Sequence, residues 1–299
     1  MTRIESYGWR GAVEPGVGRV VRAHGDYYSL VCNEAEGEIP ARKKKSAFTR
    51  MKTSAPDSMK GAKISEVRMT APPAPVTGDF VRFAYNPGGD SMITEVLPRF
   101  SRFERRDPAA RRTSQTLAVN FDVLFLVMSL DANFSLRRLA RYLELAADVG
   151  EAETVLLLTK RDVAGDVAHE MLRESVELAG CAAECLAVSA VSGEGIDAVR
   201  KMLAPGRTAA LVGSSGVGKS TLLNTLIGEE VAAVGEIQSW SGKGRHTTTS
   251  RRLFMLPWGA MVVDTPGIRE IGAVGEAEAV LAKGASTHRY RVAGGAIGK

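Results

Sequence analysis

The chain has 299 residues, of which 44% are hydrophobic and 24% charged, which predicts about two soluble domains of roughly 150 residues each. No apolar run approaches the ~20 residues of a membrane span, and the first residues contain no apolar stretch of signal-peptide length. Three cysteines are too few for a disulfide scaffold. Residues 1–112 hold 20 Lys and Arg against 13 Asp and Glu, whereas 113–299 hold 19 against 21. We therefore expect a cytoplasmic protein without a membrane partner, whose basic N-terminal part faces a polyanion.

Short strands broken by turn residues are predicted over 17–21, 27–32, 79–85 and 92–97. A basic, irregular stretch from Arg42 to Arg68 separates the two pairs. This pattern predicts that residues 1–97 form a small barrel of the oligonucleotide-binding (OB) type. Such a barrel would bind RNA phosphates through Arg and Lys, with base stacking from residues such as Tyr27, Tyr28 or Phe83.

Residues 98–116 carry six arginines without hydrophobic periodicity, so we expect a basic linker over 98–118. From 119 to 272, apolar strands alternate with amphipathic helices. The expected strands are 123–128, 155–158, 185–188, 209–212, 253–256 and 261–263, and helices are expected from Leu136 to Ala147 and over 166–179. This alternation predicts an α/β domain with a mostly parallel sheet covered on both faces. Residues 273–299 would form a short tail.

The motif Gly213–Ser220 matches the phosphate-binding loop (P-loop) in full, between an expected strand and an expected helix. Its glycines let backbone N–H groups point at phosphate oxygens, and the helix N-terminus adds positive charge. Lys219 would act catalytically by neutralising the β- and γ-phosphates, and the Ser220 hydroxyl would ligate Mg²⁺. We assign to nucleotide binding Gly213, Ser214, Ser215, Gly216, Val217, Gly218, Lys219, Ser220 and Thr221.

Two later segments would complete the phosphate side of the site. Asp264 and Gly267 belong to an Asp-x-x-Gly motif at a strand end, where the acid would hold Mg²⁺ through water and the glycine N–H would face the γ-phosphate. A threonine of the segment Arg245–Thr249 would complete the Mg²⁺ ligands as a switch loop does. We take Thr248, although the sequence does not fix the register among its three threonines.

Two short motifs at neighbouring strand ends predict guanine recognition. Thr159-Lys160-Arg161-Asp162 follows one expected strand, and Ser189-Ala190 follows the next. Asp162 would accept two hydrogen bonds from guanine N1 and N2, which adenine cannot donate together, while the Lys160 stem packs on the ring. A backbone N–H of Ser189 or Ala190 would face the guanine O6. These residues favour GTP over ATP, so an ATP-dependent kinase or ATPase is disfavoured.

The guanine motifs precede the P-loop here, whereas in ordinary GTPases they follow it. That order indicates a circular permutation, which surface termini and loops tolerate. A basic barrel followed by a permuted GTPase domain resembles the RsgA (YjeQ, EngC) family. The residues that carry the resemblance are Val76–Asp79, Gly213–Thr221, His246–Thr249 and Asp264–Glu270.

The resemblance implies a GTPase of late small-ribosomal-subunit maturation. Such a protein binds the subunit and its rRNA, and the subunit stimulates hydrolysis of GTP to GDP and phosphate; we expect it to be a monomer. Ile268 stands where many GTPases carry a glutamine that positions water, and the resemblance makes His246 the catalytic candidate in its place. The alternative is an RNA-binding or ribosome-binding protein that holds GTP with little hydrolysis.

The chain departs from the family after the second switch. Relatives continue into a module whose Cys and His residues bind one zinc ion, whereas 29 residues follow Glu270 here and none is a cysteine. His288 alone cannot supply a tetrahedral site. We therefore predict no zinc ligands, and a zinc module that is missing or degenerate.

Overall fold

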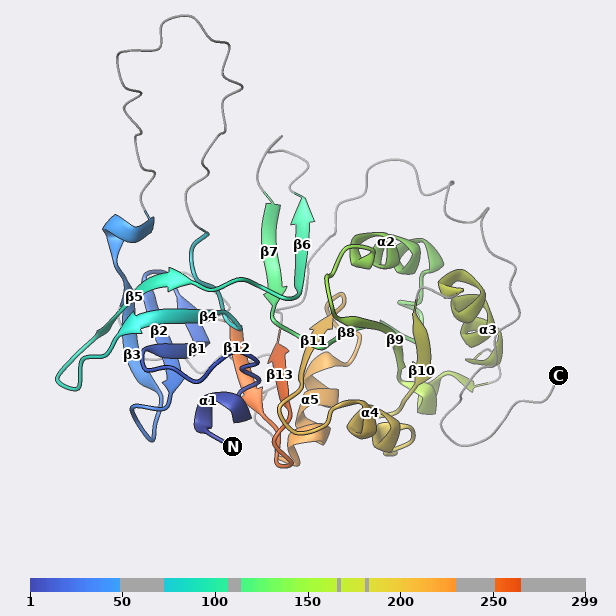
Figure 1. Ribbon diagram of the computed structural model, residues 1–299. Coiled ribbons are helices and arrows are strands. Elements are labelled where there is room, and N and C mark those ends of the chain that lie inside the picture. The colour runs from blue at the N-terminus through green and yellow to red at the C-terminus, as the bar shows by residue number, and fades with distance from the viewer. Residues whose placement is uncertain (49–72, 107–113, 166–167, 181–182, 230–250, 265–299) are drawn as a thin grey trace, which may run out of the picture.

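The computed structural model describes residues 1–48, 73–106, 114–165, 168–180, 183–229 and 251–264. These residues form a five-stranded barrel beside a helix-covered sheet, with a hairpin standing between the two (Figure 1). None of the helices in these ranges combines the length and apolar character that a membrane span requires.

The N-terminal part is a closed barrel. Its strands are β1 (Val17–His24), β2 (Tyr27–Cys32), β3 (Ile39–Lys43), β4 (Phe80–Ala84) and β5 (Ser91–Val96), and the short helix α1 (Arg3–Ser6) precedes them. The long strand β1 pairs with both β2 and β4, β2 pairs with β3, and β5 closes the ring by pairing with β3 in parallel and with β4 antiparallel. Val20, Leu30, Val81 and Ile93 fill the interior. The expected OB-type barrel is confirmed.

The basic stretch after β2 is partly regular, which corrects the expectation that it is irregular from Arg42 onward. Arg42 and Lys43 belong to β3, and the 3₁₀ helix η1 (Lys45–Phe48) follows. Ile39 and Ala41 are buried while Arg42 is exposed, so β3 has the alternation of a half-buried strand. The rest of the stretch, 49–68, lies outside the described residues.

The segment expected as a linker contains a β-hairpin. Strands β6 (Arg102–Arg106) and β7 (Ser114–Val119) pair antiparallel and form a sheet of their own. Phe103 is fully buried and packs with Leu117 into the core under helix α2 (Leu136–Ala146). These two apolar side chains, set among arginines, anchor the hairpin on the second domain, so the segment expected as a basic linker contains regular structure.

The C-terminal part is a parallel sheet with one antiparallel strand. Its order is β10 (Glu184–Ala187), β9 (Glu153–Thr159), β8 (Val123–Ser129), β11 (Thr208–Val212), β13 (Met261–Asp264) and β12 (Arg251–Met255), the last being antiparallel to β13. Helices α2 and α3 (Ala168–Ala179) cover one face, and α4 (Ile196–Met202) and α5 (Lys219–Ile227) cover the other (Figure 1). All seven residues of β8 are buried, as a central parallel strand requires. The expected doubly covered α/β sheet is confirmed.

One continuous sheet of 11 strands joins the two domains. The end of β1 pairs antiparallel with β12, with Arg22 opposite Arg252 and Ala23 opposite Arg251. In Figure 1, β12 and β13 accordingly lie between the barrel and the remaining strands. The barrel thus binds the strand that begins directly after the segment 230–250.

A fully buried arginine lies at this junction. The Arg19 guanidinium donates hydrogen bonds to the carbonyls of Tyr7, Gly78 and Asn120 and to the Thr208 hydroxyl. Burial lowers the pKa of Arg19 to about 10, which still leaves the group charged at neutral pH. Thr208 begins β11, the strand that leads into the P-loop, so this one side chain links the barrel to the base of that strand.

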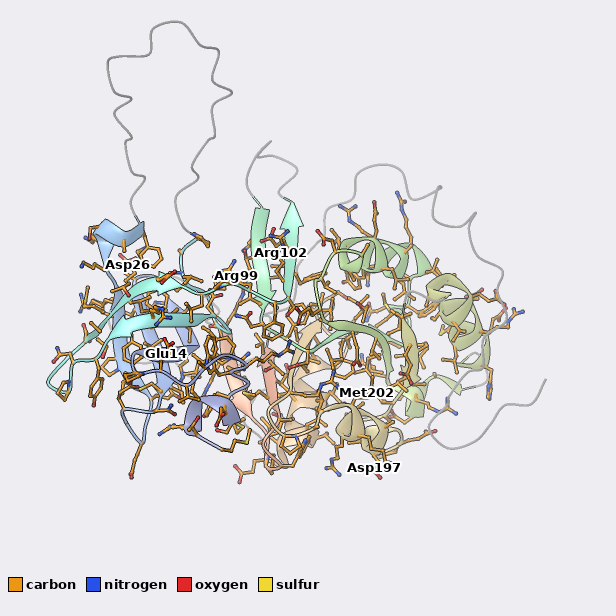
Figure 2. All side chains as sticks on the ribbon, in the orientation of Figure 1. Glu14, Asp26, Arg99, Arg102, Asp197 and Met202 are labelled. Carbon is orange, nitrogen blue, oxygen red and sulfur yellow. The ribbon has the colours of Figure 1, made fainter. Side chains whose placement is uncertain are left out.

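A buried ion pair adds to the junction. Arg99 donates to both carboxylate oxygens of Asp79, at 2.7 and 2.8 Å, and the Asp79 side chain is fully buried. Figure 2 labels Arg99 between the barrel and the hairpin. Because a bidentate pair fixes both side chains, it sets the position of the segment 76–79 against the stretch that leads into the hairpin.

Candidate nucleotide-binding site

The P-loop joins β11 to α5 as the sequence predicts. Gly216 and Gly218 have φ values of +79° and +92°, a backbone region that favours glycine. A Cβ atom on Gly213 would lie 2.5 Å from the Val127 carbonyl oxygen, so this position accepts no side chain. The glycines therefore let the loop turn tightly against β8 before the helix begins.

Lys219 is the first residue of α5 and is largely buried within the loop. Its ammonium donates to the Gly213 and Ser214 carbonyls, at 2.8 and 2.7 Å. The first-turn N–H groups of a helix have no partner within the helix and attract anions. Lys219 and the start of α5 together provide the positive, donor-rich cradle that a phosphate group requires.

Thr159 connects the predicted guanine motif to the P-loop. It ends β9, it is buried, and its hydroxyl donates to the Val217 carbonyl of the P-loop. Lys160, the next residue, has a left-handed backbone with φ of +61°, which turns the chain sharply at the strand end. The two motifs are separated by more than 50 positions in the sequence, but this hydrogen bond places them in direct contact.

The two guanine motifs are hydrogen-bonded to each other. The Ser189 hydroxyl donates to Asp162 Oδ1 at 2.6 Å and accepts the backbone N–H groups of Val191 and Ser192. Arg161 forms an ion pair with Glu194 at 2.6 Å, which joins the same two loops a second time. Asp162 itself is exposed, so its carboxylate is oriented by Ser189 and still open to a ligand.

The remaining residues of these motifs have mainly supporting contacts. The backbone N–H of Ser189 donates to the Glu194 carbonyl, which leaves Ala190 as the better source of a free N–H. The Thr225 hydroxyl of α5 donates to the Ala190 carbonyl at 3.1 Å and to the Thr221 carbonyl at 3.0 Å. Thr221 is exposed. Helix α5 thus contacts a predicted guanine motif as well as following the P-loop.

Two residues of the candidate site were missed by the sequence analysis: Asp131 lies in the loop after β8, and Arg138 lies in the first turn of α2. Asp131 Oδ2 lies 2.8 Å from Lys160 Nζ. Arg138 Nη1 donates to the Ser214 hydroxyl of the P-loop at 3.2 Å and to the Asn133 carbonyl at 3.3 Å. The signal for Asp131 was its place just beyond a buried strand, because the carboxyl ends of neighbouring parallel strands converge on one ligand site.

The switch motifs lie largely beyond the described residues. Gly267, His246 and Thr248 are in the ranges that the structure does not describe, as are Ile268 and the tail with His288. Asp264 ends β13, where its backbone is opposite Leu211 of the P-loop strand. In the described part of the chain, no group of three or more His, Cys, Asp or Glu side chains could hold a metal ion.

Of the three stacking candidates on the barrel, only Tyr27 faces solvent. Tyr27 is 57% exposed, whereas Tyr28 and Phe83 are each 5% exposed and belong to the barrel core. Tyr28 and Phe83 were wrong candidates because neighbouring side chains along a strand point to opposite faces, and theirs point inward. The Arg42 guanidinium lies over the Tyr27 ring, 4.4 Å from its centroid.

Comparison with known proteins supports the same architecture. The family model described as RsgA GTPase matches residues 96–274. The crystal structure of YjeQ from Thermotoga maritima is similar, with a TM-score of 0.55 and 25% identity over 84% of this chain and 74% of that one. The structure of YloQ, described as a circularly permuted GTPase, has a TM-score of 0.51 and 18% identity over 88% of this chain and 76% of that one.

Relatives in sequence carry the same family name. The small ribosomal subunit biogenesis GTPase RsgA 2 of Lactiplantibacillus plantarum is 35% identical over 85% of this chain and 66% of its own length. The RsgA of Leptospira interrogans serovar copenhageni is 33% identical over 91% of this chain and 72% of its own length. Among the curated relatives compared, the share of their own length that the chain covers falls as low as 53%. With a family model over more than half of its residues and relatives matched over most of its length, the chain belongs to the RsgA GTPase family.

Proposed function

We propose that the chain binds GTP and hydrolyses it to GDP and phosphate during maturation of the small ribosomal subunit. The observation that carries this proposal is the hydrogen bond between Ser189 and Asp162, in a loop that Thr159 ties to the P-loop. A carboxylate held in this way next to a phosphate cradle suits guanine, which offers two adjacent N–H donors. The names of the relatives supply the ribosomal context.

The P-loop residues would bind and orient the triphosphate. The carbonyls of Gly213 and Ser214 hold the Lys219 ammonium inside the loop, where it would neutralise phosphate charge as it develops in the transition state. The Arg138 guanidinium adds a second positive group beside Ser214. Fixed donors of this kind stabilise a transition state because they need no reorganisation during the reaction.

The guanine loops would select the base. Asp162 would accept the guanine N1 and N2 hydrogens, and the Arg161–Glu194 pair would keep the two loops at a fixed separation. Ala190 would offer its N–H to the guanine O6, since Thr225 fixes the Ala190 carbonyl. A site built to accept two hydrogen bonds rejects a base that cannot donate them by orders of magnitude.

The oxygen donors present are compatible with Mg²⁺. Ser220 is partly buried at the second position of α5, directly beside the P-loop lysine. Its hydroxyl, with Asp264 and Thr248 as the further ligands proposed from sequence, makes the hard oxygen set that Mg²⁺ prefers. When bound, the ion would neutralise charge on the β- and γ-phosphate oxygens.

We propose His246 as the residue that orients the attacking water, because Ile268 has no polar group for that task. The barrel would contact rRNA through basic side chains, with Tyr27 as its exposed stacking residue. Binding dominated by phosphate contacts falls steeply with salt. We further propose that the protein acts as a monomer and that the subunit stimulates hydrolysis.

Steady-state hydrolysis with and without purified small ribosomal subunits tests the proposal, with ATP as the control nucleotide. We expect a slow rate with GTP alone that rises many-fold with subunits, and no turnover of ATP. A rate that subunits leave unchanged would contradict the assembly role. Tight GTP binding without turnover in either condition would favour the alternative of an RNA-binding protein that only holds GTP.

Base selection is tested by Asp162→Asn. The amide replaces one acceptor by a donor, so it suits xanthine, whose C2 carries a carbonyl where guanine carries an amino group. We expect GTP affinity to fall and XTP affinity to rise, whereas Asp197→Asn, an exposed carboxylate on α4, should change neither.

A further inference from the structure

The two carboxylate oxygens of Asp131 make different contacts. Oδ2 lies 2.8 Å from the Lys160 ammonium. Oδ1 accepts the Ser129 hydroxyl at 2.7 Å and the Asn133 backbone N–H at 2.9 Å. The carboxylate is therefore held by its own loop on one side and contacts the guanine motif on the other.

The Asp131–Lys160 pair is partly sheltered from solvent. The Lys160 side chain is 33% exposed and the Asp131 side chain 23%. Such a pair is screened less by salt than one at the open surface. The link also spans two neighbouring strands, since Asp131 follows β8 and Lys160 follows β9.

Lys160 needs an anchor if its stem is to cover a base. A lysine side chain has a flexible four-carbon stem and loses rotamer entropy when it is fixed. An ion pair present before the ligand arrives fixes the ammonium in advance, and preorganisation of this kind increases affinity. The left-handed backbone of Lys160 starts the side chain from a fixed direction, and Asp131 fixes its far end.

We propose that Asp131 is a positioning residue for the nucleotide base: it holds the Lys160 ammonium so that the lysine stem lies over the purine ring. This inference rests on the proposed guanine-nucleotide site. It extends that site to the loop between β8 and α2, next to the first turn of α2, where Arg138 contacts Ser214 of the P-loop. The competing explanation is that Asp131 only shapes its own loop through Oδ1.

The variant Asp131→Asn separates these two explanations. An asparagine keeps the Oδ1 acceptor for Ser129 and Asn133 but places an amide donor in front of the Lys160 ammonium. The variant Lys160→Met keeps an apolar stem and removes the ammonium. A double-mutant cycle of the two changes measures their coupling. The matched control is Asp148→Asn, an acid that is 93% exposed and lies beyond the opposite end of α2.

The measurement is the affinity of the full chain for fluorescently labelled GDP, together with thermal unfolding of each variant. We expect Asp131→Asn to weaken GDP binding roughly tenfold and to change it less than about twofold in the Lys160→Met background. The lysine stem covers any purine, so the affinity for IDP, which lacks the 2-amino group, should fall by the same factor as the affinity for GDP. Asp148→Asn should bind GDP as the wild type does.

Three results would overturn the inference. Wild-type affinity in Asp131→Asn would show that the ion pair positions nothing, and an equal loss in the Lys160→Met background would assign Asp131 to loop shape alone. A selective loss of GDP over IDP would assign it to base readout instead of lysine positioning. Failure of the wild-type chain to bind GDP is a distinct result, which would remove the proposed function and this inference with it.

Discussion

The Thr77 hydroxyl donates a hydrogen bond of 3.1 Å to the Arg251 carbonyl, and this bond joins the barrel to the first residue of β12. Thr77 is buried, at 2% exposed. Arg251 in turn donates to the Thr116 carbonyl of the hairpin at 2.7 Å. The start of β12 is thus held from the barrel and from the hairpin at once.

Replacing Thr77 by valine should destabilise the junction, because the Arg251 carbonyl loses its donor while the side-chain volume stays nearly the same. We expect the free energy of unfolding in urea to fall by about 1 kcal/mol. Thr77→Ser keeps the hydroxyl and should lose less. A larger loss in Thr77→Ser than in Thr77→Val would mean that the methyl group, and not the hydrogen bond, contributes the stability.

Arg19→Met should be the more damaging change at this junction. The methionine replaces the apolar stem but leaves several buried acceptors without a donor, so we expect a loss of about 3 kcal/mol or more in urea unfolding. The control is Arg22→Met on the same strand, where the side chain is 45% exposed and the expected change is within about 0.5 kcal/mol. Similar losses in both variants would contradict the role of Arg19 as the junction's buried donor.

The P-loop glycines should differ in their tolerance of alanine. Gly213→Ala places a Cβ against the Val127 carbonyl, so the loop or β8 must move, and both stability and GDP affinity should fall. At Gly216 a Cβ would meet no atom within 4 Å. The substitution there should lower the free energy of unfolding only through the left-handed backbone that alanine must adopt, by about 1–2 kcal/mol. Urea unfolding of the two variants should therefore rank Gly213→Ala as the less stable, and the opposite order would argue against close packing of the loop on β8.

Acid should remove the stability that Asp131 contributes. Burial acts to raise its pKa, but the hydrogen bonds from Lys160, Ser129 and Asn133 together lower the pKa of Asp131 to about 2. Because this folded-state value lies below the ordinary value near 3.9, the contribution is present above pH ~4 and is lost as the pH falls toward ~2.

The stability difference between wild type and Asp131→Asn should accordingly be largest near neutral pH and shrink between pH ~4 and pH ~2. Urea unfolding at several pH values measures this difference. A difference that stays constant down to the lowest pH would show that the carboxylate charge contributes nothing.

The sequence predicted the parts of the fold whose signals are local. Strand β2 was expected over 27–32, as observed, and the P-loop was placed between its strand and helix because the motif and its flanks are contiguous. The hairpin was missed because only Phe103 and Leu117 mark it among many charged residues. Lys43 was taken for part of an irregular stretch because a run of lysines masks the alternation of β3.

The contacts that assemble the site could not be predicted in the same way. Asp162 and Ser189 were expected to act on a base, but their mutual hydrogen bond depends on the order of β9 and β10 in the sheet. Asp131 follows a strand that carries no recognisable motif, and its partner Lys160 is 29 positions away. Arg19 and Thr208 are 189 positions apart, and their contact follows only from the packing of the two domains.

The pairing of β1 with β12 has a consequence for any attempt to divide the chain. Fragments cut between the barrel and the second domain would each expose a strand whose backbone N–H and C=O groups have lost their partner. Exposed sheet edges recruit other strands and promote aggregation. The isolated halves should therefore be prone to self-association, whereas in the undivided chain the two strand edges pair with each other.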